Sequence, residues 1–295
     1  MSPVEKASES EIRSLLLDYR RQNWAGIQRP EWHARIADDL LREDGTGILS
    51  HVALACTLPA DPTILDVGSG VGSFVVGCRR RGLRAFGVEP DRIGRGAALT
   101  SIEIARRRVD EQVFAVAVGE KLPFGDACFD LVTMNQVIEH VKDQKLVLRE
   151  ALRVVRPGGV VYIACPNYLR FYESHYKIFW FPLLPKTLGR LYLRLRGRDP
   201  VLLDQLTYTT NSRLRRLCAT IARGDACVDL HGQTFLAKCR DASFARPWFR
   251  IVAKSMRLPL LGGILERMAL AFARVTEGGC EVAIVRGSHL VDGSC

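Results

Sequence analysis

The run ILDVGSGVGSF, Ile64 to Phe74, decides the fold, because an apolar strand pattern ends in an acidic residue and three glycines then lead into a helix. Gly68, Gly70 and Gly72 let the backbone approach a ligand where a Cβ atom would collide. The first turn of the helix offers unpaired amides to a carboxylate. A dinucleotide fingerprint would place its third glycine one position later, where this chain has Ser73. The spacing therefore speaks against a nicotinamide dehydrogenase.

Short apolar runs separated by helical stretches surround this motif. The runs are TILDV, RAFGVE, VFAVAV, DLVTMN and VVYIAC, followed by ACVDL and CEVAIVR. Such alternation predicts βαβ units and a doubly wound α/β sheet, whose ligands bind at the carboxyl ends of the strands.

An acidic residue follows the glycines at the end of the second apolar run. Glu89 lies about twenty residues after the glycines, the position from which a carboxylate accepts hydrogen bonds from ribose hydroxyls. The alternative interpretation is a solvated acid at the end of a strand. A glycine run alone could likewise be an ordinary turn between a strand and a helix.

Helical patterns precede the sheet. Ser8 and Glu11 have the spacing of a capping box, and apolar residues then recur at helical intervals, so a helix is predicted from near residue 9. Trp32, Ile36 and Leu40 predict a second helix. We therefore expect residues 1–60 to form a helical cap ahead of a core at 61–167.

Several blocks occur in a specific order across residues 61–167: DVGSGVG, GVEPD, GEKLPFGDACFD, NQVIEHV and LREALRVVRPGGVVYIACPN. Together they resemble the ubiquinone-biosynthesis-type (methyltransferase type 11) small-molecule methyltransferases, a class I S-adenosylmethionine-dependent family. The resemblance implies a Rossmann-like sheet of seven strands with the last strand antiparallel, and S-adenosylmethionine bound across the carboxyl ends of the first strands. We interpret RPGG, Arg156 to Gly159, as a turn that terminates a helix before the fifth strand.

The resemblance also implies cofactor-binding residues. Asp66 and the glycines at 68, 70 and 72 would hold the methionine part and face the adenosine, and Glu89 would hold the ribose. Asn135 would lie where the fourth strand delivers groups to the methionine and the transferring methyl.

The adenine end departs from the family pattern. Gly119 and Glu120 would border the adenine. Many relatives carry an aspartate where this chain has Val118, so recognition of the adenine amino group would rely on the backbone or on Glu120.

Methyl transfer from a sulfonium needs no proton on the leaving group, so the protein must mainly align and desolvate the reactants. A base is required only for a poorly acidic hydroxyl or a protonated amine. His140, which follows Glu139 in VIEHV, is the best-placed candidate base. The alternative is that both side chains orient the loop by hydrogen bonding. Glu173 and His175 are further candidates.

Aromatic and basic residues gather in an insertion at 168–210, which we expect to form a lid over the methyl site. Its apolar parts would accept a hydrophobic substrate, and the arginines of residues 168–198 would meet phosphate or a membrane surface. Alternatively, the aromatics pack on the sheet and the arginines stay solvated. Residues 211–295 would complete the core, with a second, helical insertion at about 240–276.

The composition sets further limits. The formal net charge is +10, and the nine cysteines include no CxxC pair, so we expect a reducing compartment and no metal. No stretch reaches the ~18 apolar residues of a membrane span. The expected location is cytoplasmic, with possible peripheral contact to the inner face of a membrane.

These observations predict methyl transfer from S-adenosylmethionine to a small or lipid-linked acceptor, with O-methylation favoured. A nucleic-acid methyltransferase is the second hypothesis, but MNQV replaces the Pro-Pro-aromatic motif of amino-methylating base enzymes, so nucleic acid is an unexpected partner. A catalytically silent scaffold of the same fold is the third, against which the intact glycines and Glu89 speak.

Overall fold

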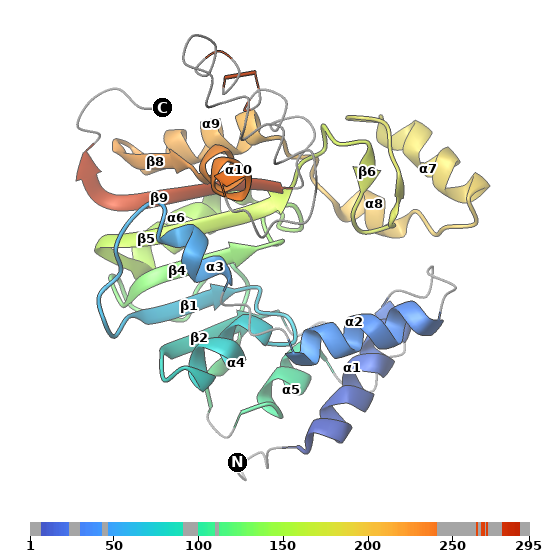
Figure 1. The fold of residues 1–295 in the computed structure, drawn as a ribbon, viewed down its shortest axis with the longest axis horizontal. Coiled ribbons are helices and arrows are strands. Elements are labelled where there is room, and N and C mark those ends of the chain that lie inside the picture. Colours follow the sequence, from blue (N-terminus) through green and yellow to red (C-terminus); the bar gives the residue numbers. More distant parts are fainter. Residues whose placement is uncertain are drawn as a thin grey trace.

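A seven-stranded sheet forms the centre of the protein (Figure 1) in the order β3-β2-β1-β4-β5-β9-β8. The computed structural model describes residues 7–23, 30–42, 47–90, 100–109, 112–240, 264, 267–268, 270 and 279–289. The strands are β1 (Thr63–Val67), β2 (Arg84–Glu89), β3 (Phe114–Val116), β4 (Phe129–Asn135), β5 (Val155–Pro166), β8 (Asp225–Asp229) and β9 (Gly279–His289). Strands β1 to β5 pair in parallel, whereas β9 is antiparallel to β5 and to β8. The predicted Rossmann-like fold with its antiparallel last strand is confirmed.

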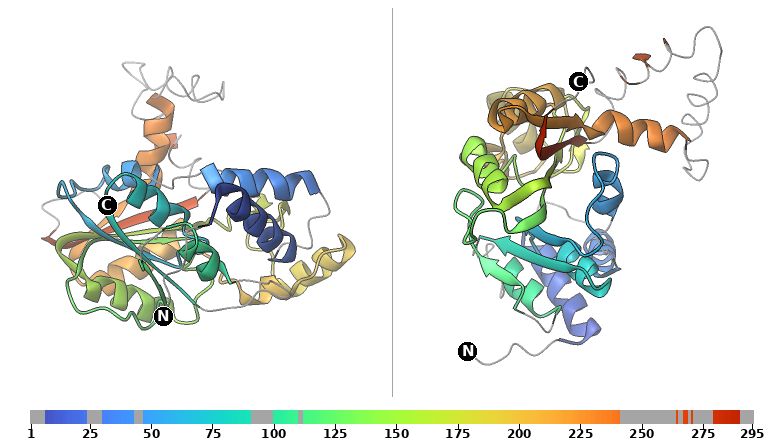
Figure 2. Two further views of the ribbon diagram at one scale, coloured as in Figure 1. Left: turned by 90° about the horizontal axis from the view of Figure 1, so that it is seen from below. Right: turned by 90° about the vertical axis from the view of Figure 1, so that its left-hand side faces the viewer.

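Helices cover both faces of this sheet. Alternate strand residues point to opposite sides, and apolar residues on both sides need to be buried. Ile64 and Leu65, consecutive in β1, belong to two different buried clusters. The cluster around Leu65 includes residues of α6 (Gln144–Val154) and α9 (Asn211–Ala222). The cluster around Ile64 includes residues of α3 (Gly47–Val52), α4 (Ser73–Arg80), α5 (Ser101–Arg106) and α10 (Leu230–Arg240). Figure 2 shows the resulting three layers edge-on in its right-hand view.

The strand order places a topological switch beside β1. The chain runs from β1 outward to β2 and β3, then returns to place β4 on the other side of β1. Asp66 of β1 consequently lies opposite Thr133 of β4 and Gly87 of β2. Ligands of doubly wound sheets bind at the carboxyl ends of the strands at such a point.

The two amino-terminal helices, α1 (Glu9–Asn23) and α2 (Pro30–Arg42), lie within residues 1–60, and we call them the cap. The capping box is present, since the Ser8 amide donates to Glu11 Oε2 at 2.7 Å and the Glu11 amide donates to Ser8 Oγ at 3.3 Å. The cap packs on the glycine loop and on α5 through Ile12, Leu16, Ala37, Val71 and Ile104. It lies on the side of the sheet toward which the arrowheads of β1 and β4 point (Figure 1).

The insertion after β5 has a small core of its own. It consists of β6 (Tyr172–Glu173), β7 (Ile178–Phe179), α7 (Lys186–Leu195) and α8 (Val201–Gln205). Its buried cluster contains Tyr176, Ile178, Trp180, Leu193 and Leu203. The alternative in which the aromatics pack on the sheet is therefore wrong for these side chains, which pack within the insertion.

The RPGG segment differs from its predicted form. Helix α6 ends at Val154 and β5 begins at Val155, so Arg156 to Gly159 belong to an irregular start of the strand rather than to a separate turn. A Cβ atom on Gly159 would lie 2.7 Å from the carbonyl oxygen of Asp130. Glycine is needed here because β4 and β5 approach closely at the irregularity.

The second predicted insertion, at about 240–276, lies almost entirely outside the described residues. Among the helices that the structure describes, none is both long and apolar enough to cross a membrane.

Candidate functional site

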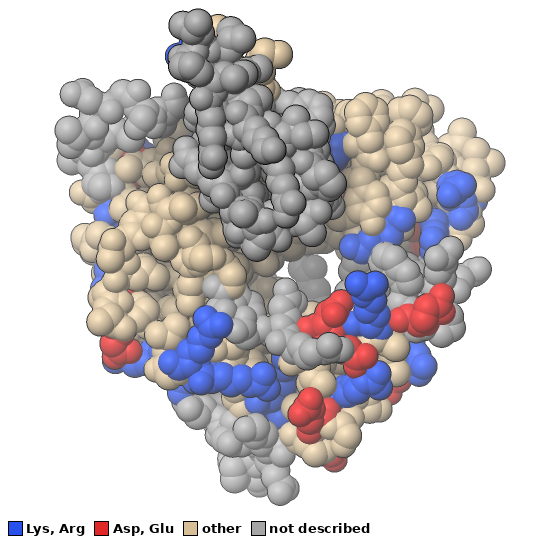
Figure 3. All heavy atoms as spheres, in the orientation of Figure 1, with Lys and Arg blue, Asp and Glu red and all other residues tan. Residues whose placement is uncertain are grey.

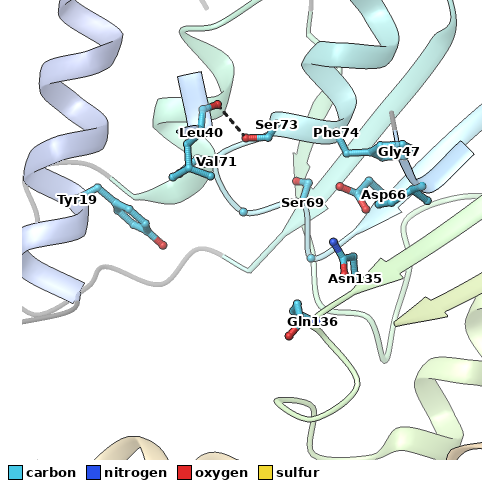
Figure 4. A pocket seen from close by; sticks show the side chains of 13 residues that line it. Tyr19, Leu40, Gly47, Asp66, Ser69, Val71, Ser73, Phe74, Asn135 and Gln136 are labelled. Carbon is cyan, nitrogen blue, oxygen red and sulfur yellow. Dashed lines mark hydrogen bonds between the residues drawn. The ribbon is translucent and has the colours of Figure 1, made fainter. Parts of the chain in front are cut away.

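A pocket of about 530 Å³ opens at the carboxyl ends of β1 and β4 (Figure 4). The sheet, the glycine loop and the cap all contribute to its walls. The lining residues are Tyr19, Leu40, Gly47, Ile48, Asp66, Gly68, Ser69, Gly70, Val71, Ser73, Phe74, Asn135 and Gln136. The predicted residues Asp66, Gly68, Gly70 and Asn135 therefore come together at one site.

The three glycines of the loop differ in what surrounds them. All three have positive φ, at +73° for Gly68, +53° for Gly70 and +80° for Gly72. A Cβ atom on Gly68 would collide with Val137, and one on Gly72 would lie 2.7 Å from Phe114 Cζ. A Cβ atom on Gly70 would meet nothing within 4 Å. Packing inside the protein therefore explains Gly68 and Gly72, whereas Gly70 borders open space in the pocket.

Backbone hydrogen bonds hold the loop against β2. The amides of Gly68 and Ser69 both donate to the carbonyl oxygen of Val88, at 2.8 and 3.0 Å. Gly72 is the N-cap residue of α4, and no side chain of the described structure accepts a capping hydrogen bond there. The first turn of α4 therefore keeps amide groups for a ligand, as the sequence predicts.

Asp66 is buried at the end of β1, with its side chain directed into the pocket. Its Oδ1 accepts a hydrogen bond of 2.7 Å from Thr133 Oγ1. Burial raises the pKa of Asp66 to about 7, and the nearby Glu89 carboxylate adds to the shift while the Thr133 bond opposes it. A carboxyl group that titrates near neutrality beside a pocket is typical of ligand sites.

Glu89 lies behind the glycine loop rather than in the pocket wall. Its Oε2 accepts from the Gly70 amide at 3.0 Å, and its Oε1 accepts from Ser101 Oγ at 3.3 Å. The side chain thus ties the loop to α5, and its predicted contact with a ribose stays a prediction.

The end of β4 delivers two polar side chains to the pocket. Asn135 is the last residue of the strand, and Gln136 follows it with a φ of +60°. The Gln136 amide donates to the Ala164 carbonyl oxygen at 2.8 Å. A left-handed backbone at a residue other than glycine is uncommon, and here it turns the chain at the pocket.

The two residues predicted at the adenine end do not line this pocket. Gly119 is buried, and a Cβ atom on it would lie 3.3 Å from Val67 Cγ1. The Glu120 Oε1 atom accepts from the Lys142 amide at 3.2 Å. Glu120 is therefore linked to the loop after β4, and its role toward adenine stays a prediction.

Comparisons with known proteins identify a family for the part of the chain that forms the core of the sheet. Residues 65–163 match the family described as a methyltransferase domain. Residues 65–163 therefore carry a class I S-adenosylmethionine-dependent methyltransferase domain.

Relatives of the methyltransferase domain include uncharacterized methyltransferases of mycobacteria. One from Mycobacterium sp. (strain KMS) is 36% identical over 119 residues, which are 40% of this chain and 44% of the relative. One from Mycolicibacterium vanbaalenii is 32% identical over 140 residues, or 47% of this chain and 52% of the relative. The chain thus spans about half the length of these relatives. A solved Thermotoga maritima structure, described as a possible histamine N-methyltransferase, is 24% identical, covers 61% of this chain and 70% of its own, and has a TM-score of 0.40.

The helices before the methyltransferase domain supply pocket residues that the sequence did not mark as ligand-binding. Tyr19 of α1 and Leu40 of α2 reach the pocket, as do Gly47 and Ile48 of α3 (Figure 4). Helical periodicity predicts these helices. It does not predict which of their side chains reach a pocket whose other residues lie far along the chain.

His140 of the methyltransferase domain lies in a cluster of ionisable groups after β4. Its Nε2 is 3.9 Å from Glu139 Oε1, and its ring meets that of His175 edge-on with centroids 5.1 Å apart. Glu139 is fully buried, and burial raises its pKa to about 7, with Glu173 adding to the shift. The sequence candidates His140 and His175 are thus brought together across 35 residues of sequence.

Proposed function

We propose that the protein transfers a methyl group from S-adenosylmethionine to a hydrophobic or lipid-linked acceptor that it meets at an anionic membrane surface, with a hydroxyl oxygen as the favoured acceptor atom. The methyltransferase domain supports the class of reaction. The exposed surface of the insertion supports the choice of a hydrophobic or lipid-linked acceptor.

The pocket fits the cofactor. Its volume falls within the range of roughly 300 to 1,000 Å³ found for small-molecule sites. Asp66 offers a carboxylate to the methionine ammonium, the open space beside Gly70 admits a ligand close to the backbone, and Asn135 offers an amide. When bound, S-adenosylmethionine supplies the activated methyl group. The cap residues Tyr19 and Leu40 add largely apolar side chains to the pocket wall, which favours exclusion of water.

The observation that supports a hydrophobic acceptor is a stripe of exposed leucines on α7. Leu188, Leu191 and Leu195 are 55%, 55% and 77% exposed. Their spacing places them on one helical face. The opposite face is buried, since Gly189 and Leu193 pack into the core of the insertion.

Three exposed aromatic rings accompany the stripe on the same insertion. The ring centroids of Phe171 and Phe179 are 5.9 Å apart, and those of Phe179 and Phe181 are 5.1 Å apart. Each ring is at least half exposed. We call these three phenylalanines and the three leucines of α7 the apolar face of the insertion.

Basic side chains adjoin the apolar face. Arg194, Arg196 and Arg198 have no ion-pair partner within the part of the chain that the structure describes, whereas Arg190 pairs with Asp204 at 2.8 Å. Figure 3 shows lysine and arginine side chains around the region of α7 and α8. An exposed apolar face beside unpaired cations is the pattern of a segment that lies in a membrane interface.

Vesicle co-sedimentation tests the membrane contact. The full chain is expected to bind phosphatidylglycerol vesicles at low salt, to bind less at high salt, and to bind phosphatidylcholine vesicles weakly, because salt screens the arginines. Changing Leu191 and Leu195 together to glutamate should abolish binding. The control L54E adds a charge at another exposed leucine, away from the insertion, and should bind as the wild type does. Absence of binding at low salt would contradict the proposal.

Transfer of labelled methyl from S-adenosylmethionine to a cell extract tests the acceptor. Label in the organic phase is the expected result, and sensitivity of the product to ester or ether cleavage identifies the acceptor oxygen. Label in RNA or DNA would instead support the nucleic-acid hypothesis. Absence of transfer by protein that binds the cofactor would support the silent scaffold.

A further inference from the structure

Three ionisable side chains converge from two separate segments. Glu139 and His140 follow the pocket residues Asn135 and Gln136 in the loop after β4, and His175 comes from the turn between β6 and β7. Each of the three offers one ligand atom, and these atoms all lie within 4.8 Å of one another. We propose that Glu139, His140 and His175 form a binding site for a divalent transition-metal ion such as Zn²⁺.

The Glu139 carboxylate is the first support. The side chain is 0% exposed, and neither of its oxygens has a hydrogen-bond partner among the described residues. Buried polar groups are normally satisfied, and a buried carboxylate without donors is costly unless a cation meets it. Nothing else described around Glu139 supplies such a cation except the two imidazoles, the nearer of which stands 3.9 Å away.

The second support is the way in which His175 is held. Its Nδ1 lies 2.8 Å from Glu173 Oε1, so the ring can donate from Nδ1 and keep Nε2 as a ligand. Glu173 is itself buried and fixed, since its Oε2 accepts from the Tyr176 amide at 2.6 Å and its Oε1 accepts from Tyr168 Oη at 3.4 Å. A carboxylate behind a histidine is the usual outer support of a metal-binding imidazole.

The geometry and donor set suit a transition metal. Tetrahedral ligands about 2.1 Å from Zn²⁺ lie roughly 3.4 Å from one another. The distance from His140 Nε2 to Glu139 Oε1 is 3.9 Å, so small side-chain rotations close the site. Two imidazoles and one carboxylate match zinc sites that keep a fourth position for water or substrate, and differ from the all-oxygen sites of Ca²⁺ and Mg²⁺.

The site gives His140 a different role from the base predicted from the sequence, because its ring nitrogen would be a ligand. It also departs from the expectation of no metal. Resting on the proposed function, a hydroxyl acceptor in the open position would lose its proton more readily, since a bound cation lowers the pKa of a coordinated oxygen. The metal site itself requires no methyl transfer, and it is tested without it.

Metal binding is measured on the full chain after treatment with chelator. Zn²⁺ is titrated by calorimetry, and Co²⁺ by visible absorption. We expect one ion per chain, Co²⁺ bands of a nitrogen and oxygen site, and loss of that ion in H140A and in E139Q. The Glu173→Gln variant should bind roughly 10- to 100-fold more weakly, because it weakens the support of His175. Urea unfolding of each variant shows whether it is folded.

The matched control is His51→Ala, which removes an imidazole on α3 that pairs with Glu281 instead. It should bind Zn²⁺ as the wild type does. Undiminished binding in folded H140A and E139Q would overturn the proposal, as would absence of binding by the wild type. A near-ultraviolet thiolate band with Co²⁺ would also overturn it, since the cysteines would then be the ligands.

Discussion

The buried guanidinium of Arg108 donates a hydrogen bond of 2.8 Å to the carbonyl oxygen of Val71 in the glycine loop. The same guanidinium donates to the carbonyl oxygen of Leu40 in α2 at 2.9 Å and to Ser73 Oγ at 3.2 Å. Val71, Leu40 and Ser73 all line the pocket. One side chain after α5 therefore fixes the cap onto the loop that is expected to hold the cofactor.

We expect Arg108→Met to weaken S-adenosylmethionine binding more than about tenfold. One buried and two partly buried acceptors lose their charged donor, and each hydrogen bond to a charged group contributes about 1.5 to 3 kcal/mol. Calorimetric titration and urea unfolding measure the two effects. Arg13→Met serves as the control, because Arg13 pairs with Asp38 on the exposed side of the cap. Equal affinities in the two variants would show that the cap does not order the pocket.

The role of Arg108 shows what the sequence could and could not predict. The strands, the glycine loop and Asp66 follow from patterns within about ten residues, so their positions at the pocket were predictable. Arg108 has no local pattern that reveals its distant carbonyl partners. His175 meets Glu139 only because the insertion folds back beside the loop after β4, and periodicity does not describe such a return. The prediction of a turn at RPGG was wrong for a similar reason, since the close approach of Gly159 in β5 to Asp130 in β4 joins residues that are distant in the sequence.

Substitutions in the glycine loop should separate binding from stability. Gly70→Ala places a methyl group in open pocket space, so it should abolish cofactor binding while costing about 1 to 2 kcal/mol of unfolding free energy for its left-handed backbone. Gly72→Ala carries the same backbone cost and also drives a methyl group into Phe114. It should therefore unfold at clearly lower urea concentration than Gly70→Ala. Retained binding in folded Gly70→Ala would mean that the ligand does not approach this part of the backbone.

The stability of the ligand-free protein should depend on the Asp66 carboxyl. Its pKa is about 7 in the folded protein and about 3.9 in an unfolded chain, so the folded state binds the proton more tightly. The contribution of Asp66 to stability is therefore fully present below about pH 4 and is lost as the pH rises to 7. Asp66→Asn removes this titration. We expect its unfolding free energy, relative to wild type, to rise between pH 5 and pH 8 by about 2 to 3 kcal/mol.

Cofactor binding should respond to the same substitution in the opposite sense. A cationic ligand favours the ionised form of Asp66, so wild-type affinity for S-adenosylmethionine should increase between pH 6 and pH 8. Asp66→Asn, which cannot ionise, should bind more weakly at pH 8 and show a flatter profile. Titrations at both values measure this. A parallel pH dependence in the two proteins would assign the effect to another group.

Trp180 should determine the integrity of the insertion independently of the cofactor pocket. Its side chain is 1% exposed, and its ring lies so close to Gly189 that a Cβ atom there would be 2.9 Å from Cη2. Because α7 packs on this ring, Trp180→Ala should lower the free energy of unfolding of the insertion by about 3 to 5 kcal/mol. We expect vesicle binding to be lost while cofactor affinity stays within about twofold, because Trp180 does not line the pocket. Phe181→Ala removes a half-exposed ring and should leave the insertion folded, with vesicle binding only reduced. If Trp180→Ala weakened cofactor binding as strongly as vesicle binding, the insertion would be part of the cofactor site rather than a separate surface beside it.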